Sequence, residues 1–274
     1  VLKLMIEVKD LRKSFDGVEV LKGITTTFET GKVNLVIGQS GSGKTVFLKS
    51  LLNVFEPTSG HILFDGRDIV GMSRQEKEAL RAEIGTVFQG SALFDSLTVQ
   101  DNIMFPLDMF TNLTFTEKKK RVKEVIGRVH LENAEKKFPS EISGGMQKRV
   151  AIARAIVNNP RYLFCDEPNS GLDPFTANVI DDLIAEITDE YNTTTIINSH
   201  DMNSVMTIGE KIVYLRKGIK EWEGTKDILI TSDNNYLIDF VYSSELFKEL
   251  REYLIKINKT SIENIITKID DETD

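Results

Sequence analysis

Two short segments of the chain carry residues that could bind and hydrolyse a nucleoside triphosphate. The first, at residues 38–45, reads G-Q-S-G-S-G-K-T. Its glycines would let backbone N–H groups wrap around phosphate at the start of a helix. We expect Lys44 to reach the β- and γ-phosphates and Thr45 to bind Mg²⁺. A flexible Gly/Ser turn is the alternative, but the apolar run before the segment and the helical pattern after it favour a phosphate-binding loop.

The second segment, Y-L-F-C-D-E at residues 162–167, ends an apolar run with two acids. We expect Asp166 to hold Mg²⁺ through water and Glu167 to polarise the attacking water as general base. Phosphoryl transfer depends on such placement of charge more than on covalent chemistry. Two acids after a strand could also be ordinary exposed loop residues, and Cys165 is interpreted as core filling. The phosphate-binding loop upstream favours the catalytic interpretation.

The elements that would position these residues alternate between strands and helices. Short β-type runs with turn signals at 18–21, 24–28 and 62–64 predict strands, several of them antiparallel. The apolar run 33–37 leads through the glycine loop into a helical pattern. Further strands at 162–165 and 194–198 alternate with helices at 143–157 and 177–190. This order predicts an α/β core with a mostly parallel sheet covered by helices.

Two regions stand apart from this core. A helical insert is expected from about residue 98, and residues 116–133 place apolar side chains at helical spacing opposite a charged side. After residue 226, apolar stripes between Leu246 and Ile269 predict two amphipathic helices before an acidic end. We therefore expect a domain over 1–226, with a helical subdomain at about 98–157, and a C-terminal helical extension over 227–274. The stripes could bind a partner or pack on the chain's own core.

The composition of the chain argues against several classes of protein. The 274 residues carry a net charge of −8, which argues against a general grip on nucleic acid. A single cysteine rules out an internal disulfide, and three histidines make a His-built zinc site improbable. Neither a secretory signal pattern nor a run of about 20 apolar residues is present. The expectation is a cytoplasmic chain that contacts a membrane only through partners.

Two more segments indicate a family. I-S-G-G-M-Q-K-R at 142–149 lies between the phosphate-binding loop and D-E-P-N-S-G-L-D-P at 166–174. This set, in this order, resembles the ATP-binding cassette (ABC) family over roughly residues 5–226. The resemblance implies a P-loop NTPase fold with a RecA-like parallel-sheet core, an antiparallel β subdomain and a helical signature subdomain. It also implies hydrolysis of ATP with Mg²⁺.

The resemblance assigns further roles at matching positions. Ser143 and Gly145 match the signature loop, which meets the γ-phosphate bound to the other subunit, so each ATP would lie between two chains. Two copies of this chain are the simpler pairing because its motifs are intact. Asp173 matches the acid of the loop that crosses the dimer. Gln89 matches the residue that links Mg²⁺ and water to a transmembrane partner, and His200 the histidine that contacts the γ-phosphate.

The nucleotide base has a candidate partner too. Phe15 lies where the family places an aromatic ring on adenine, and a flat π-face is what stacking needs; core packing is the alternative. The expected catalytic residues are Glu167, His200, Gln89 and Lys44, and the expected Mg²⁺ contacts are Thr45, Gln89 and Asp166. The expected nucleotide contacts are Phe15, Gly38, Gln39, Ser40, Gly41, Ser42, Gly43, Lys44, Thr45, Val46, Ser143, Gly145 and Asp173.

The loop after Gln89 suggests a subfamily. Residues 92–96, A-L-F-D-S, and Met146 resemble the ATPase subunits of Mla and Mce-associated lipid transporters, although Gly90-Ser91 stands where Ser-Gly is expected. The resemblance implies a permease, an Mce-type lipid-binding protein, a small cytosolic regulatory subunit and a place on the cytoplasmic face of the inner membrane. The alternatives are an importer of another small solute and a soluble ABC ATPase outside transport. The F-D-S-L-T-V loop disfavours the latter.

Overall fold

The computed structural model describes residues 5–243, 248–249, 251–253 and 256. Most of the C-terminal stripes expected between Leu246 and Ile269 therefore lie outside the described residues. Within the described part of the chain, none of the helices has both the length and the apolar character that crossing a membrane requires.

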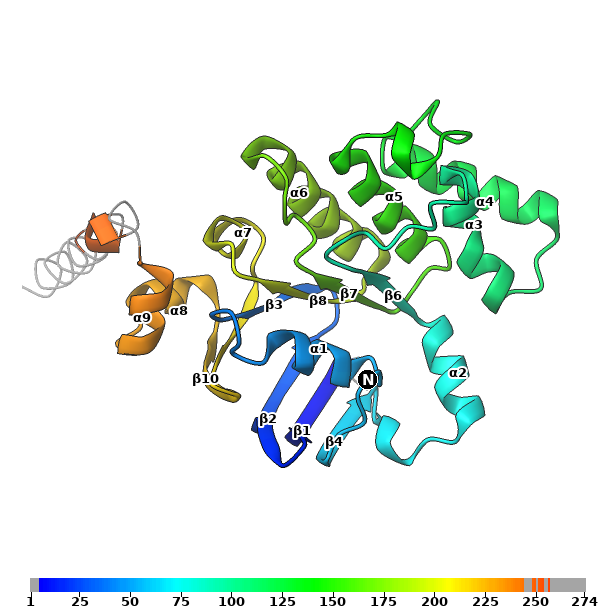
Figure 1. Ribbon diagram of the computed structural model, residues 1–274. Helices are drawn as coiled ribbons and strands as arrows, with labels where there is room; N and C mark the ends of the chain where they lie inside the picture. Colours follow the sequence, from blue (N-terminus) through cyan, green and yellow to red (C-terminus); the bar gives the residue numbers. More distant parts are fainter. Residues whose placement is uncertain (1–4, 244–247, 250, 254–255, 257–274) are drawn as a thin grey trace, which may run out of the picture.

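A six-stranded sheet forms the centre of the molecule (Figure 1). Its order is β10-β9-β3-β8-β7-β6; β6 to β9 and β3 run parallel, and β10 pairs antiparallel with β9. The strands are β3 (Lys32–Ile37), β6 (Ile84–Val87), β7 (Tyr162–Asp166), β8 (Thr194–Ser199), β9 (Lys211–Arg216) and β10 (Ile219–Gly224). Because carboxyl ends of parallel strands meet at one edge, the segments after β3, β6, β7 and β8 come together there.

A second, antiparallel sheet has the order β2-β1-β4-β5. Its strands are β1 (Met5–Phe15), β2 (Val18–Glu29), β4 (Ser59–Phe64) and β5 (Arg67–Asp68). The runs 18–21 and 24–28 expected as separate strands are one strand, joined through Gly23 at φ 86°. Gly23 is the extra residue at a bulge between the pairs Leu11–Ile24 and Arg12–Lys22, and its positive φ is a conformation that glycine adopts without strain.

Helices cover both faces of the central sheet. One face of the central sheet is covered by α1 (Lys44–Leu51), which lies between the two sheets (Figure 1). The opposite face is covered by α5 (Gly144–Ile156), α6 (Pro174–Tyr191) and α7 (Met202–Thr207). Alternation along β7 shows the consequence: Phe164 packs in the core around α1, whereas Leu163 and Cys165 pack toward α5 and α6. The mixed α/β fold with a parallel sheet, an antiparallel sheet and a helical insert is confirmed.

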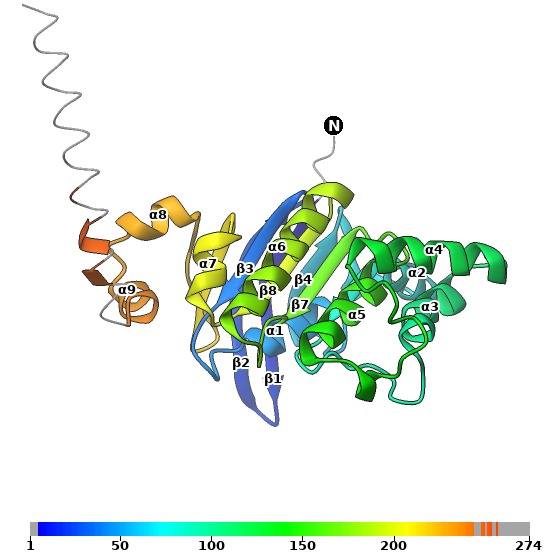
Figure 2. The ribbon, with the colours of Figure 1, turned by 90° about the horizontal axis from the view of Figure 1, so that it is seen from above.

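The remaining helices lie at the two ends of the molecule. At one end, α3 (Val99–Phe110) and α4 (Phe115–Arg128) pack with α5, and α2 (Arg74–Ala82) precedes β6. At the opposite end lie α8 (Lys226–Thr231) and α9 (Asn235–Val241) (Figure 2). Threonine and serine caps begin the insert helices: Thr98, Thr114 and Ser143 each accept a hydrogen bond from the backbone N–H three residues later.

Candidate functional site

The glycine loop surrounds the ammonium group of Lys44, the first residue of α1. Lys44 Nζ donates hydrogen bonds to the carbonyl oxygens of Gly38 at 2.7 Å and Gln39 at 3.2 Å. Burial lowers the pKa of Lys44, and the nearby carboxylates of Glu167 and Asp166 oppose that shift. A Cβ on Gly38 would lie 2.3 Å from the carbonyl oxygen of Leu215, so the loop needs glycine to reach this position. The lysine is therefore held at the centre of the loop.

A cavity of about 740 Å³ opens above this loop. It gathers residues from four loops at the carboxyl edge of the sheet, in agreement with the strand order. Its lining is Val20, Gln39, Ser40, Gly41, Gly43, Lys44, Thr45, Val46, Gln89, Glu167, His200 and Phe240. Gly38 and Ser42 belong to the loop but do not line the cavity, and the buried Ser42 hydroxyl has no hydrogen-bond partner. Residues far apart in the sequence thus share one cavity.

Glu167 is the centre of a hydrogen-bonded group in this cavity. Its Oε2 accepts from Gln89 Nε2 at 2.8 Å, and its Oε1 lies 3.0 Å from His200 Nδ1. The Glu167 backbone has a left-handed φ of 47°, and its N–H donates to the Asn198 carbonyl oxygen at 3.0 Å. This turn aims the carboxylate into the cavity rather than along β7. A carboxylate held this way could orient and deprotonate water.

The predicted metal contacts offer oxygen atoms only: the Thr45 hydroxyl, the Asp166 carboxylate and the Gln89 amide oxygen. Asp166 Oδ1 accepts from Asn198 Nδ2 at 3.0 Å, which fixes the carboxylate at the end of β7. The buried Asn198 Oδ1 beside it has no hydrogen-bond partner. Because Gln89 turns its amide nitrogen to Glu167, its oxygen is the atom left for a cation or water. These donors fit Mg²⁺, which prefers oxygen ligands.

Besides Gly38, Ser42 and Asp166, which lie in or beside the site loops, the predicted contacts that do not line this cavity are Phe15, Ser143, Gly145 and Asp173. Phe15 is 36% exposed, and its ring packs edge-to-face on Phe55 at 5.1 Å. Ser143 and Asp173 cap α5 and α6, and both side chains are exposed. Their predicted contacts with nucleotide across a dimer stay predictions, because one chain alone cannot present them to its own glycine loop.

The signature loop and the start of α6 lie against each other in the same chain. A Cβ on Gly145 would lie 2.8 Å from Thr176 Cγ2. Thr176 donates to Asp173 through its backbone N–H at 3.0 Å and its hydroxyl at 2.6 Å. These hydrogen bonds lower the pKa of Asp173, so the exposed acid stays ionised. The two candidate dimer contacts therefore form one surface.

Two lining residues were missed in the sequence. Val20 comes from β2, and Phe240 comes from α9, where its ring stacks on Tyr214 with centroids 5.2 Å apart. The spacing of Leu237 and Val241, both buried, is a helical signal that was available. It shows that α9 exists, but the proximity of this helix to the glycine loop depends on packing against β9, which spacing does not reveal.

A buried acid ties two of the site loops together. Asp181 on α6 is 2% exposed and accepts hydrogen bonds from Asn169 Nδ2 at 3.3 and 3.4 Å. Asn169 Nδ2 also donates to Ser204 Oγ at 2.9 Å, on the helix α7 that follows His200 in the chain. Burial raises the pKa of Asp181 to about 6. The acid therefore titrates near neutral pH beneath the site.

This raised pKa predicts a pH-dependent stability. A folded pKa near 6, above the unfolded value of about 4, stabilises the fold at low pH, and that stabilisation is lost as pH rises through 6. Between pH 5 and pH 8 the loss should be about 1 kcal/mol. Asp181→Asn should remove this part of the pH dependence in urea unfolding, whereas Asp189→Asn on the exposed side of α6 should not. An identical slope in wild type and Asp181→Asn would contradict the assignment.

A model of the family described as ABC transporter matches residues 21–170. The "Probable ribonucleotide transport ATP-binding protein mkl" of Mycobacterium bovis is 39% identical over 236 residues, which are 86% of this chain and 66% of that protein. The "Methionine import ATP-binding protein MetN" of Corynebacterium diphtheriae is 36% identical over 87% of this chain and 72% of the relative. The chain thus spans just under two thirds of the length of the first of these relatives.

A solved structure agrees with these matches. The dimeric bacterial ABC transporter cassette MJ0796 superimposes with a TM-score of 0.74 at 32% identity, covering 80% of this chain and 98% of that one. A second structure of the same cassette is described as a post-hydrolysis state bound to ADP and Pi.

Proposed function

The chain belongs to the ABC transporter family, and from this premise we propose that it is the ATP-hydrolysing subunit of a membrane transporter. In this proposal Lys44 and His200 contact phosphate, and Thr45, Asp166 and Gln89 hold Mg²⁺. Glu167 deprotonates a water that Gln89 helps to place. The observation that carries the proposal is the Glu167 carboxylate, fixed between Gln89 and His200 above the glycine loop. Placement of this kind is what phosphoryl transfer requires.

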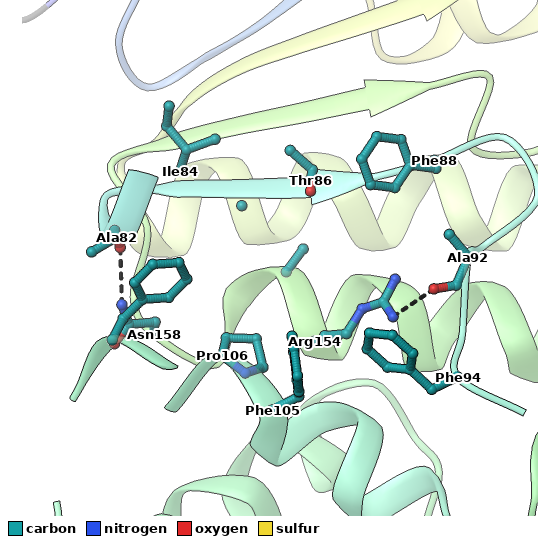
Figure 3. A pocket seen from close by; sticks show the side chains of 13 residues that line it. Ala82, Ile84, Thr86, Phe88, Ala92, Phe94, Phe105, Pro106, Arg154 and Asn158 are labelled. Atoms are coloured by element: carbon teal, nitrogen blue, oxygen red, sulfur yellow. Dashed lines mark hydrogen bonds between the residues drawn. The ribbon is translucent and has the colours of Figure 1, made fainter. Parts of the chain in front are cut away.

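An apolar groove beside the loop that carries Gln89 supports the transport role, because it could bind a partner close to the site. The loop after Gln89 borders an apolar groove of about 260 Å³ between β6, α3 and α5 (Figure 3). The groove is lined mainly by aromatic and small apolar side chains, among them Phe88, Phe94, Phe105, Pro106 and Phe110. Phe88, Phe94 and Phe110 are each about 40% exposed. Exposed aromatic rings in a groove suit the apolar face of an inserted helix. We propose that a cytoplasmic helix of a permease docks here.

We further propose that the cargo is phospholipid or another lipid, that the chain lies at the cytoplasmic face of an inner membrane, and that an Mce-type lipid-binding protein lies beyond that membrane. Residues 92–96 and Met146 support this proposal through their resemblance to Mla and Mce-associated ATPases. A small regulatory subunit and a second copy of the chain complete the proposed assembly. The relatives' names, which refer to ribonucleotides and methionine, favour the second candidate, uptake of a small polar solute.

Co-purification distinguishes the two candidates. The full chain, tagged and expressed at a low level, is extracted with membranes in mild detergent, and co-purifying proteins and lipids are identified by mass spectrometry. A permease with an Mce-type protein and bound phospholipid is the expected result. A permease with a solute-binding protein and no enriched lipid would replace lipid by small-solute transport.

The groove can be tested in the same material. Phe110→Asp places a charge in the groove and should abolish capture of the permease while ATP binding persists. Phe115→Asp, on an exposed ring of α4 outside the groove, is the matched control and should retain the permease. Capture of the permease by the Phe110→Asp chain would place the docking surface elsewhere.

A further inference from the structure

The backbone that follows Gln89 adopts an unfavourable conformation. Ser91 and Ala92 have left-handed φ angles of 61° and 49°. Such angles cost an L-residue with a Cβ about 1 kcal/mol or more each, and they persist where surrounding contacts impose them. Within the loop, the Ser91 N–H donates to the Phe88 carbonyl oxygen at 2.9 Å, and the Ala92 N–H to that of Gly90 at 2.7 Å. Two short turns alone do not explain why this conformation is kept.

Two cationic side chains of α5 bind carbonyl groups of this loop. Lys148 Nζ donates to the Gln89 carbonyl oxygen. Arg154 donates through Nη1 to the Ala92 carbonyl at 2.7 Å and through Nη2 to the Ser91 carbonyl at 2.8 Å (Figure 3 shows the bond to Ala92). Three carbonyl groups in four consecutive residues are therefore tied to a single helix.

Both cations are buried. Lys148 is 5% exposed and Arg154 is 9% exposed, and burial lowers the pKa of each. Within the part of the chain that the structure describes, neither forms an ion pair with a carboxylate. The nearby charge of Glu167 favours the charged form of Lys148, and the guanidinium of Arg154 lies 5.9 Å from the centre of the Phe94 ring. The direct hydrogen-bond acceptors of both cations are the loop carbonyls, and a buried cation needs such acceptors. The carbonyl bonds are consequently strong constraints on the loop.

The same helix also presents the signature loop. Ser143 caps the N-terminus of α5, Lys148 follows five residues later, and Gln89 reaches from the clamped loop to Glu167. A shift of α5 toward or away from the sheet would thus move the backbone of Gln89, and through it the side chain that touches Glu167.

We propose that Lys148 and Arg154 are positioning residues for Gln89, which join the signature helix to the water-orienting side chain through the carbonyl groups of residues 89–92. This inference rests on the role of Gln89 in the proposed function. Neither residue touches nucleotide in this arrangement. Each acts by fixing the loop from which Gln89 projects.

A double-mutant cycle tests the proposal on the purified full chain. Lys148→Met keeps the aliphatic stem and removes the donor, so kcat for ATP should fall about tenfold while KM changes less than twofold. In a Gln89→Ala background the same substitution should change kcat by less than twofold, because the group that Lys148 positions is already gone. Lys148→Gln, which keeps an N–H donor, should recover most of the lost rate.

Arg121→Met is the matched control. Arg121 on α4 also donates to carbonyl oxygens of α5, those of Ile156 and Val157, but away from Gln89. Its loss should leave kcat unchanged. Equal losses from Lys148→Met with and without Gln89 would overturn the positioning role, and an active Gln89→Ala chain would instead overturn the proposed function of Gln89. If Lys148→Met does not fold, Arg154→Lys, which keeps the charge and loses one carbonyl bond, is carried through the same cycle.

Discussion

Replacing Glu167 with glutamine is expected to lower the rate of ATP hydrolysis by about 100-fold or more while ATP still binds. The amide keeps the shape of the side chain and can still accept one hydrogen bond, from Gln89 or from His200. It cannot take a proton from water. The contacts of Lys44 and the glycine loop with phosphate are unaffected, so affinity for ATP should change little.

The same substitution should also change the association state. If ATP holds two copies together until it is hydrolysed, a chain that binds but does not cleave ATP should accumulate as a nucleotide-bound dimer. Light scattering after size-exclusion chromatography with ATP and Mg²⁺ measures this. Glu210→Gln is the control, because Glu210 accepts a hydrogen bond from the Val33 N–H outside the cavity. Near wild-type turnover in Glu167→Gln would remove Glu167 from the role of general base.

Much of the catalytic centre could be predicted because its signals are local. The glycine loop, Asp166 and Glu167 each follow an apolar strand, and a parallel sheet places such ends at one edge. Gln89 and His200 were placed by family resemblance, and the structure brings both to the Glu167 carboxylate.

What the sequence did not reveal depends on packing between distant elements. The strands β6, β9 and β10 carry no long apolar alternation of their own, and their place in the sheet is set by neighbouring strands. The bond from Lys148 to Gln89 joins residues 59 positions apart. A lysine within a helical pattern is most simply interpreted as exposed, and only the packed structure shows that it is buried.

The strand that contains Gly23 was predicted wrongly for the same reason, since its continuity depends on a neighbouring strand. Turn signals and apolar runs predicted two strands, but a glycine within a strand can mark a bulge rather than a chain reversal. The bulge lies between the pairs Leu11–Ile24 and Arg12–Lys22 of neighbouring strands, which is a matter of register.

Substituting Ser143 with arginine is expected to abolish ATP hydrolysis without weakening the binding of ATP to the same chain. Ser143 caps α5 and does not line the cavity of its own glycine loop. An arginine there would keep this signature loop from the γ-phosphate bound to the second copy. Loss of the cap costs about 1 kcal/mol of stability. Ser73→Arg, which removes the cap of α2, should show that cost with normal turnover.

Mixing two inactive chains decides whether the site is shared. Lys44→Ala removes the phosphate-binding lysine, and Ser143→Arg removes the signature contact, so each homodimer lacks both sites. A mixed dimer pairs the intact glycine loop of the Ser143→Arg chain with the intact signature of the Lys44→Ala chain, which rebuilds one complete site. We expect the mixture to hydrolyse ATP where neither chain alone does. No gain in rate on mixing would mean that Ser143 serves its own chain, and the paired site would have to be abandoned.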